Sequence, residues 1–377
     1  MRGSPNLDDI INVFSCCILT WKALTVMLPA FGLAGAIAVF IPAPLVLRHF
    51  GAGSRKMVAY GFAAISGFFL SVCSCNIVPL FQSIYRRGAG LGPAATFLYA
   101  GPAIHLVSLV FTYRVIGFRI ALCRAIAVPV IAVIVGVTMA LVFRSEEAKR
   151  QTAHAASPAM MLDGQPVRRL APFFASLLLL MLIGGLDEEQ VWFLTWPVRV
   201  AVTVALAGVA ALVAAKWFDR EELKEWGLET WKLVRFTVPI LLVSVLVIGY
   251  IAQAVPLTTL DHLGLIGERG HSVGSAFKVS AFGAFMYFPV LSEVAFVKAF
   301  LKPGLVGMPP SLGLILLLTG AGLSLPGQIL ILRAVGIKKL VVYVVLVIVL
   351  AAVAGLIFDH FVGQYICPCT EGSASSL

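Results

Sequence analysis

Long runs of apolar residues constrain this chain more than any other feature of its sequence. Hydrophobic residues make up 60% of the 377 positions and charged residues only 12%, which is far too apolar for soluble domains. Eight runs have about the twenty residues that a helix needs to cross a bilayer. They are Ala23–Leu47, Gly92–Tyr113, Ile120–Phe143, Leu170–Leu186, Val191–Ala215, Val234–Leu257, Pro310–Leu332 and Leu340–Phe358. The sequence therefore predicts an all-α, polytopic membrane protein with about eight to ten transmembrane helices.

Two shorter apolar runs need a separate interpretation. Met57–Val72 is followed at once by the short segment Ile77–Tyr85, and Ala276–Leu291 by Val294–Leu301. Each pair forms either one span plus an interfacial helix or a re-entrant hairpin that enters and leaves by the same face. We favour the hairpin, because it makes the two halves of the chain antiparallel, the arrangement that gives alternating access by symmetry.

The chain also repeats itself. Thr20-Trp21-Lys22 and the later Pro29 recur as Thr230-Trp231-Lys232 and Pro239. Hydrophobic helices alone would not align Trp, Pro, Gly and Arg in the same order, so we interpret the matches as a duplication. Further matches pair Gly101, Arg114, Gly117 and Arg119 with Gly320, Arg333, Gly336 and Lys338.

Charge gives the expected orientation and organisation. The connection 187–190 has no Lys or Arg, so we place it outside, and the net charge of +10 fits cytoplasmic anchoring to anionic lipid. The predicted parts are a first repeat over 1–143 with an interfacial helix at 8–20, a cytoplasmic loop at 144–169, two linker spans at 170–215, a second repeat over 216–358 and a tail at 359–377.

The segment Cys73-Ser74-Cys75-Asn76 stands where an apolar run ends shortly before Pro79. Asn76 favours a helix start and Pro79 removes a backbone donor, so we predict a break between two half-helices. Thiolates are soft ligands, which makes Cys73 and Cys75 candidate metal or metalloid ligands, with Asn76 beside them in a substrate site. The alternative is that both thiols only pack as small apolar side chains.

Glu293 is the carboxylate placed best for proton coupling. It borders or enters the membrane, where a charged side chain is costly unless it is paired or protonated. The alternative is an interfacial glutamate that pairs with Lys298.

Two spans are interrupted at matching places. Gly101-Pro102 and the nearby His105 break one span, and the segment from Gly320 through Ser324 to Gly327 breaks the other. Paired interruptions of this kind indicate a binding site near the membrane midplane. We therefore name Gly101, Pro102, His105 and Ser324 as candidate substrate-binding residues. His105 could equally be a packing residue.

Two further cysteine pairs, Cys16-Cys17 and Cys367/Cys369, have no assigned role. The sequence shows no phosphate-binding loop, dinucleotide fingerprint or other catalytic motif, so we expect no cofactor. Transport is then driven by an ion gradient, the membrane potential or the substrate's own gradient, unless a separate ATPase binds. The expected partners are a small-molecule or metalloid substrate and membrane lipid, with no nucleic acid. A homo-oligomer is compatible with the sequence.

These motifs resemble the ArsP/YraQ-type permease family. The resemblance rests on Cys73 through Leu80, on Phe97 through Ile104 and on Gly322 through Pro326, and it spans nearly the whole chain. It implies a multi-pass permease of the bacterial inner membrane. Some relatives are linked to export of trivalent organoarsenicals. Asn76 and His105 replace the Gly and Asn that are common in the family.

Three functions are compatible with these features. The first is a secondary transporter that exports a soft metalloid through Cys73 and Cys75, with protons handled by Glu293 or His105. The second is a permease for a different small solute, in which the thiols pack. The third is a membrane thiol oxidoreductase. The duplication and the paired broken spans favour a transporter over an enzyme.

Overall fold

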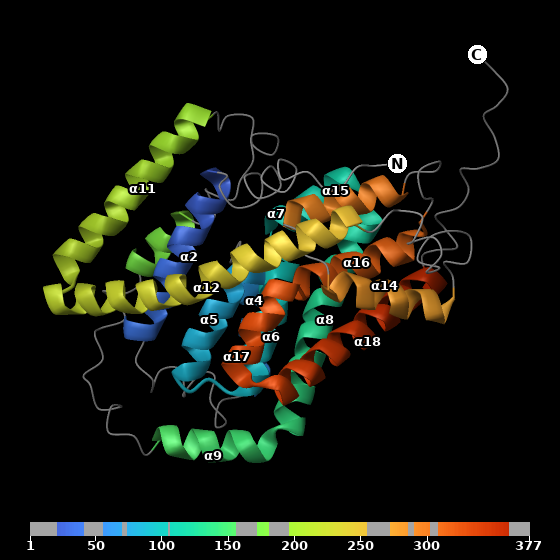
Figure 1. The fold of residues 1–377 in the computed structure, drawn as a ribbon, viewed down its shortest axis with the longest axis horizontal. Coiled ribbons are helices and arrows are strands. Elements are labelled where there is room, and N and C mark those ends of the chain that lie inside the picture. Colours follow the sequence, from blue (N-terminus) through green and yellow to red (C-terminus); the bar gives the residue numbers. More distant parts are fainter. Residues whose placement is uncertain are drawn as a thin grey trace.

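The computed structural model describes residues 21–40, 56–69, 74–104, 106–155, 172–180, 196–254, 272–285, 290–301 and 308–361. All regular structure in these ranges is helical (Figure 1). Residues 172–180 are helical as well. The helices are α2 (Trp21–Phe40), α4 (Lys56–Phe69), α5 (Ser74–Arg86), α6 (Leu91–Ala103), α7 (Leu106–Val115), α8 (Phe118–Val142), α9 (Arg144–Ala155), α11 (Trp196–Trp217), α12 (Arg220–Ala254), α14 (Val273–Phe285), α15 (Val290–Leu301), α16 (Pro310–Gly322), α17 (Leu325–Val335) and α18 (Ile337–Phe361).

Among the described helices, α8 and α18 are each long and apolar enough to cross a membrane. Two bent pairs also qualify, each taken as one span: α6 with residues 108–115, bent by 42°, and α16 with α17, bent by 46°. The bends confirm the predicted interruptions near Gly101, here called the first break, and near Gly320, here called the second break. Each long helix buries one face and exposes an apolar stripe at four-residue spacing, which suits lipid contact. The stripe on α18 is formed by Val341, Val345, Val349, Val353 and Ile357.

The helices of the two halves recur at a constant spacing. Tyr99 and Leu318 are 219 residues apart, and the same shift carries α6 onto α16 and α8 onto α18 with identical bounds. Gly117 before α8 and Gly336 before α18 correspond under this shift, and both have a positive φ, of 135° and 86°. A side chain is strained in that conformation, which explains a glycine at both turns.

The two halves interlock rather than lie side by side. Corresponding helices pack on each other in three pairs: α2 on α12, α6 on α16 and α8 on α18. Two further contacts are exchanged: α5 packs on α17, and α15 packs on α7. In a two-fold relation a helix can pack on its own counterpart, and any other contact occurs twice with the two halves exchanged. The packing of these helices follows that pattern. The packing brings both breaks to the interface between the halves.

Within each half, one close helix contact depends on a glycine. Gly136 of α8 lies against Thr96 and Gly92 of α6, and a Cβ at position 136 would be 2.6 Å from the carbonyl oxygen of Gly92. Gly355 of α18 lies in the same way against Ile315 and Ser311 of α16. Both halves therefore use the same glycine position to bring the long span close to the broken one.

Gly136→Ala is expected to destabilise the protein by about 1–3 kcal/mol, because the backbone of α6 must move to admit the methyl group. The measurement is the thermal unfolding midpoint of the purified protein in detergent. Gly208→Ala in α11 is the matched control, since a Cβ there meets nothing within 4 Å. Equal midpoints for the two variants would show that α6 and α8 do not need this close approach.

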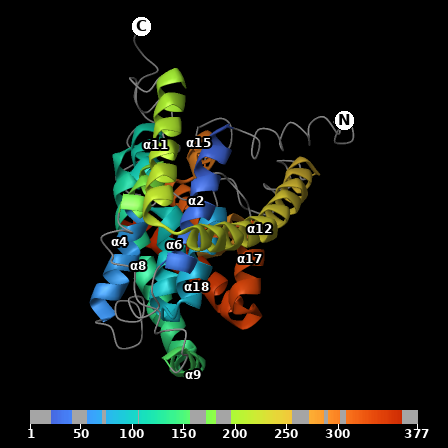
Figure 2. The ribbon, with the colours of Figure 1, turned by 90° about the vertical axis from the view of Figure 1, so that its left-hand side faces the viewer.

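The segment after α8 was predicted as a loop, but its first part is the helix α9. Arg150 of α9 donates to the carbonyl oxygens of Tyr85 (2.7 Å) and Ala89 (2.5 Å), and its guanidinium lies 3.6 Å from the centre of the Tyr85 ring. Lys339 of α18 pairs with Glu146 at 3.3 Å. These contacts tie α9 to both halves at one end of the molecule, and α15 lies at the other end (Figures 1 and 2).

Candidate functional site

Glu293 lies in the first turn of α15, and only 2% of its surface is exposed. Its carboxylate lies beside Gly320 of α16, where a Cβ would collide with Oε1. The backbone amide of Ala321 faces the carboxylate without reaching hydrogen-bond geometry. Lys298 is exposed on the same helix, so the suggested pairing with Lys298 is not what the structure shows.

The charged partner of Glu293 is Arg124 of α8, from the other half of the chain. One guanidinium nitrogen, Nη2, lies 3.9 Å from Oε2 of Glu293, and Arg124 is completely buried. Nε donates to the carbonyl oxygen of Ala103 at 3.1 Å, and Nη1 donates to Oγ1 of Thr112 at 3.1 Å. The arginine therefore connects both sides of the first break to the second half.

Sequence reasoning missed Arg124, although a signal was present. Arg124 is a basic residue within the 25-residue apolar helix α8, and the predictions from sequence give it no role. Its charged partner lies on α15, which is more than 160 residues further along the chain. The usable signal is that an arginine inside a span normally faces the protein interior and has a partner.

The second break is held in the same way by an uncharged residue. Tyr343 of α18 corresponds to Arg124 under the 219-residue shift, and its hydroxyl donates to the carbonyl oxygen of Gly322 at 3.3 Å. Gly322 in turn corresponds to Ala103, the acceptor for Arg124. At each break, a buried side chain of the next span thus donates a hydrogen bond to the last carbonyl group of the half-helix before the break. One donor is charged and the other is neutral.

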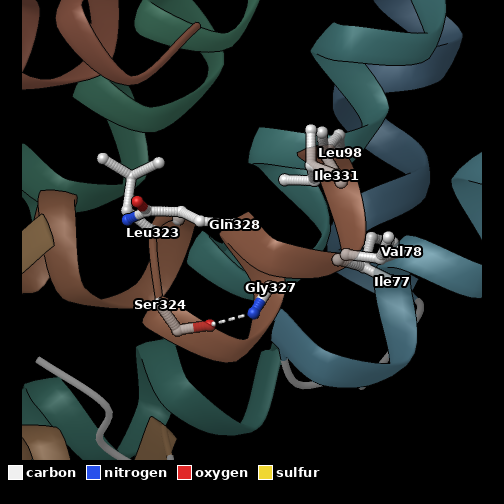
Figure 3. A pocket seen from close by; sticks show the side chains of 9 residues that line it. Ile77, Val78, Leu98, Leu323, Ser324, Gly327, Gln328 and Ile331 are labelled. Carbon is white, nitrogen blue, oxygen red and sulfur yellow. Dashed lines mark hydrogen bonds between the residues drawn. The ribbon is translucent and has the colours of Figure 1, made fainter. Parts of the chain in front are cut away.

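Ser324, a predicted binding residue, starts α17 on the far side of the second break. Its hydroxyl oxygen accepts a hydrogen bond from the backbone amide of Gly327 at 3.3 Å, which caps the helix (Figure 3). One turn further along, Nε2 of Gln328 donates to the carbonyl oxygen of Ala284 at 2.5 Å. The break is therefore fixed by hydrogen bonds from its own residues.

A small cavity lies beside this break, with a volume of about 10 Å³, or room for about one water molecule. Its lining is uncharged and joins α5 and α6 of the first half to α17 of the second (Figure 3). The lining residues are Ile77, Val78, Leu98, Gly322, Leu323, Ser324, Gly327, Gln328 and Ile331.

The remaining predicted site residues are placed as follows. Gly101 and Pro102 are buried in the last turn of α6, next to the carbonyl that Arg124 binds. Positions 75 and 76 lie in the first turn of α5, just before the cavity-lining Ile77 and Val78. Cys73 and His105 lie outside the described residues, as do Cys16, Cys17, Cys367 and Cys369. Among the described residues, no group of three His, Cys, Asp or Glu side chains could hold a metal.

The buried pair and the two bent spans define a multi-pass membrane protein with a polar centre, the usual arrangement of a transporter. A family model described as "Predicted permease", ArsP_1, matches residues 9–360, so the chain belongs to this permease family. This membership supports a transporter role.

Two relatives are similar over different lengths. The UPF0718 protein MJ0584 of Methanocaldococcus jannaschii is 33% identical over 359 residues, covering 93% of this chain and 96% of that protein. The UPF0718 protein YcgR of Bacillus subtilis is 23% identical over 149 residues, covering 39% of this chain and 49% of that protein. No solved structure matches the chain at a significant level.

Proposed function

We propose that this permease is a secondary exporter in which Glu293 binds and releases the coupling proton. The observation that carries the proposal is the buried Glu293–Arg124 pair, which connects the two halves at the first break. When a carboxylate enclosed by protein binds a proton, it loses its negative charge, and this changes the electrostatics of the site. Rocking of the halves would expose Glu293 to one side of the membrane and then to the other.

The two halves are proposed to be inverted relative to each other. The exchanged packing of α5 on α17 and of α15 on α7 supports this arrangement, because each short helix of one half supports the break of the other. An inverted pair gives two related conformations, open to opposite sides, from one set of contacts. The resemblance to the ArsP/YraQ-type permeases supports a location in the bacterial inner membrane.

The proposed substrate is a soft trivalent metalloid, such as an organoarsenical. The water-sized cavity beside the second break has an uncharged lining, and trivalent arsenic hydroxides are uncharged near neutral pH. The cavity has to widen in another conformation to admit such a solute. Position 75 is one helical turn before the cavity-lining Val78 on α5, which supports Cys75 as a ligand, with Cys73 close to it in sequence. The experiment is uptake of a panel of trivalent arsenicals and antimonials into everted membrane vesicles, with and without a proton gradient.

The double substitution Cys73→Ser/Cys75→Ser is expected to lower metalloid transport by more than about tenfold, because hydroxyls are poor ligands for soft centres. Cys123→Ser is the matched control, since Cys123 lies half-buried on α8, in the long apolar span. Uptake into everted vesicles, normalised to the amount of protein in the membrane, is the measurement. Wild-type uptake by the double variant would favour the permease for a different solute, with packing thiols.

A further inference from the structure

The Arg124–Glu293 pair is unusual because its charges are close but not hydrogen bonded. Nη2 of Arg124 and both carboxylate oxygens of Glu293 have no hydrogen-bond partner among the described residues. The other two donor groups of Arg124 are occupied by Ala103 and Thr112. The guanidinium is therefore fixed in place, with one buried donor group still available to a ligand.

Among the described residues, Glu293 is the carboxylate that interacts with Arg124. Tyr99 of α6 faces the pair, and Tyr343 of α18 faces Tyr99. Their hydroxyls donate to the carbonyl oxygens of Leu318 and Gly322. Of the helices packed on α15, α16 has no ionisable residue, and α7 has only Tyr113 and Arg114, near its far end. Lys298 on α15 itself is exposed and positive. Glu293 is thus the negative group that balances Arg124 in this part of the structure.

This balance restricts what can happen when Glu293 takes up a proton. The guanidinium stays charged at any physiological pH, so a neutral Glu293 leaves a positive charge buried without compensation. Such a state is strongly unfavourable. A proton can bind at low cost only if a negative group arrives at Arg124 in the same state.

We propose that the Arg124–Glu293 site binds a proton and one small monovalent anion together. The proton neutralises the carboxylate of Glu293, and the anion replaces that carboxylate as the counter-ion of Arg124, bonded to Nη2. The site has no net charge in either state. The anion is a free inorganic ion or the carboxylate-like group of a larger solute. This inference rests on the proposed protonation of Glu293, but not on the cysteines.

The test is the thermal unfolding midpoint of the purified full-length protein in detergent, with gluconate as the bulky reference anion at constant ionic strength. Chloride and nitrate probe a free ion, and acetate probes the anionic group of a larger solute. At about pH 5.5 a binding anion should raise the midpoint of the wild type by a few degrees, and at about pH 8 it should have no effect.

Two variants make this test specific. Glu293→Gln keeps Arg124 without a counter-ion at every pH, so the anion should stabilise this variant at both pH values. The double variant Arg124→Gln/Glu293→Gln has neither charge, and it should respond at neither pH. A response of the double variant equal to that of the wild type would overturn the proposal, as would a folded Glu293→Gln protein that responds to none of the three anions.

These outcomes are separable from those of the proposed function. If Glu293→Gln loses gradient-driven transport in vesicles but shows no anion response in detergent, the proton role stands and the anion site is wrong. If the anion responses follow the expected pattern while transport by Glu293→Gln is normal, the anion site stands and the proposed proton coupling is wrong.

Discussion

Replacing Arg124 by glutamine alone is expected to destabilise the protein by about 3–5 kcal/mol, because Glu293 then remains as a buried carboxylate without a counter-charge. The substitution also removes the bond to the carbonyl oxygen of Ala103, at the end of the first half-helix. The measurements are the yield of monodisperse protein after extraction into detergent and its thermal unfolding midpoint. Arg114→Gln is the matched control, since Arg114 is exposed at the end of α7.

The second substitution, Glu293→Gln, should restore most of the stability that Arg124→Gln removes. With both charges gone, two amide side chains occupy a site that no longer has to enclose an ion. The expected order of unfolding midpoints is wild type, then the double variant, then Arg124→Gln. If the double variant is no more stable than Arg124→Gln, the two residues do not form the pair that the structure shows.

The broken helices could be predicted from the sequence because their signals are local. Glycine and proline within an apolar run mark the breaks near Gly101 and Gly320, and the structure confirms both bends. Glu293 is also a candidate from the sequence alone, since a single carboxylate in an apolar segment needs an explanation, and the structure buries it.

The partner of Glu293 could not be predicted in the same way. The pairing with Arg124 depends on how the two halves interlock, and no local pattern encodes a contact between α8 and α15. The polar residues of α9 favour a loop when the sequence is considered alone. Its position depends on Arg150, which binds the carbonyl oxygens of Tyr85 and Ala89 at the end of α5.

Glu293→Gln is expected to abolish accumulation of substrate against a gradient while leaving exchange across the membrane intact. Glutamine keeps the size of the side chain but cannot bind and release a proton, so substrate movement is no longer linked to the proton gradient. Glu229→Gln is the matched control, because Glu229 lies on α12 and pairs with Lys232 at 2.5 Å, where both residues are partly exposed.

The most direct test is the accumulation ratio in everted vesicles, measured with the trivalent arsenical or other solute that the wild type concentrates most strongly. We expect an imposed proton gradient to raise this ratio for the wild type and for Glu229→Gln, and Glu293→Gln to stay at the ratio of vesicles without a gradient. Accumulation by Glu293→Gln at the wild-type level would contradict the account, because proton coupling would then not involve the buried carboxylate.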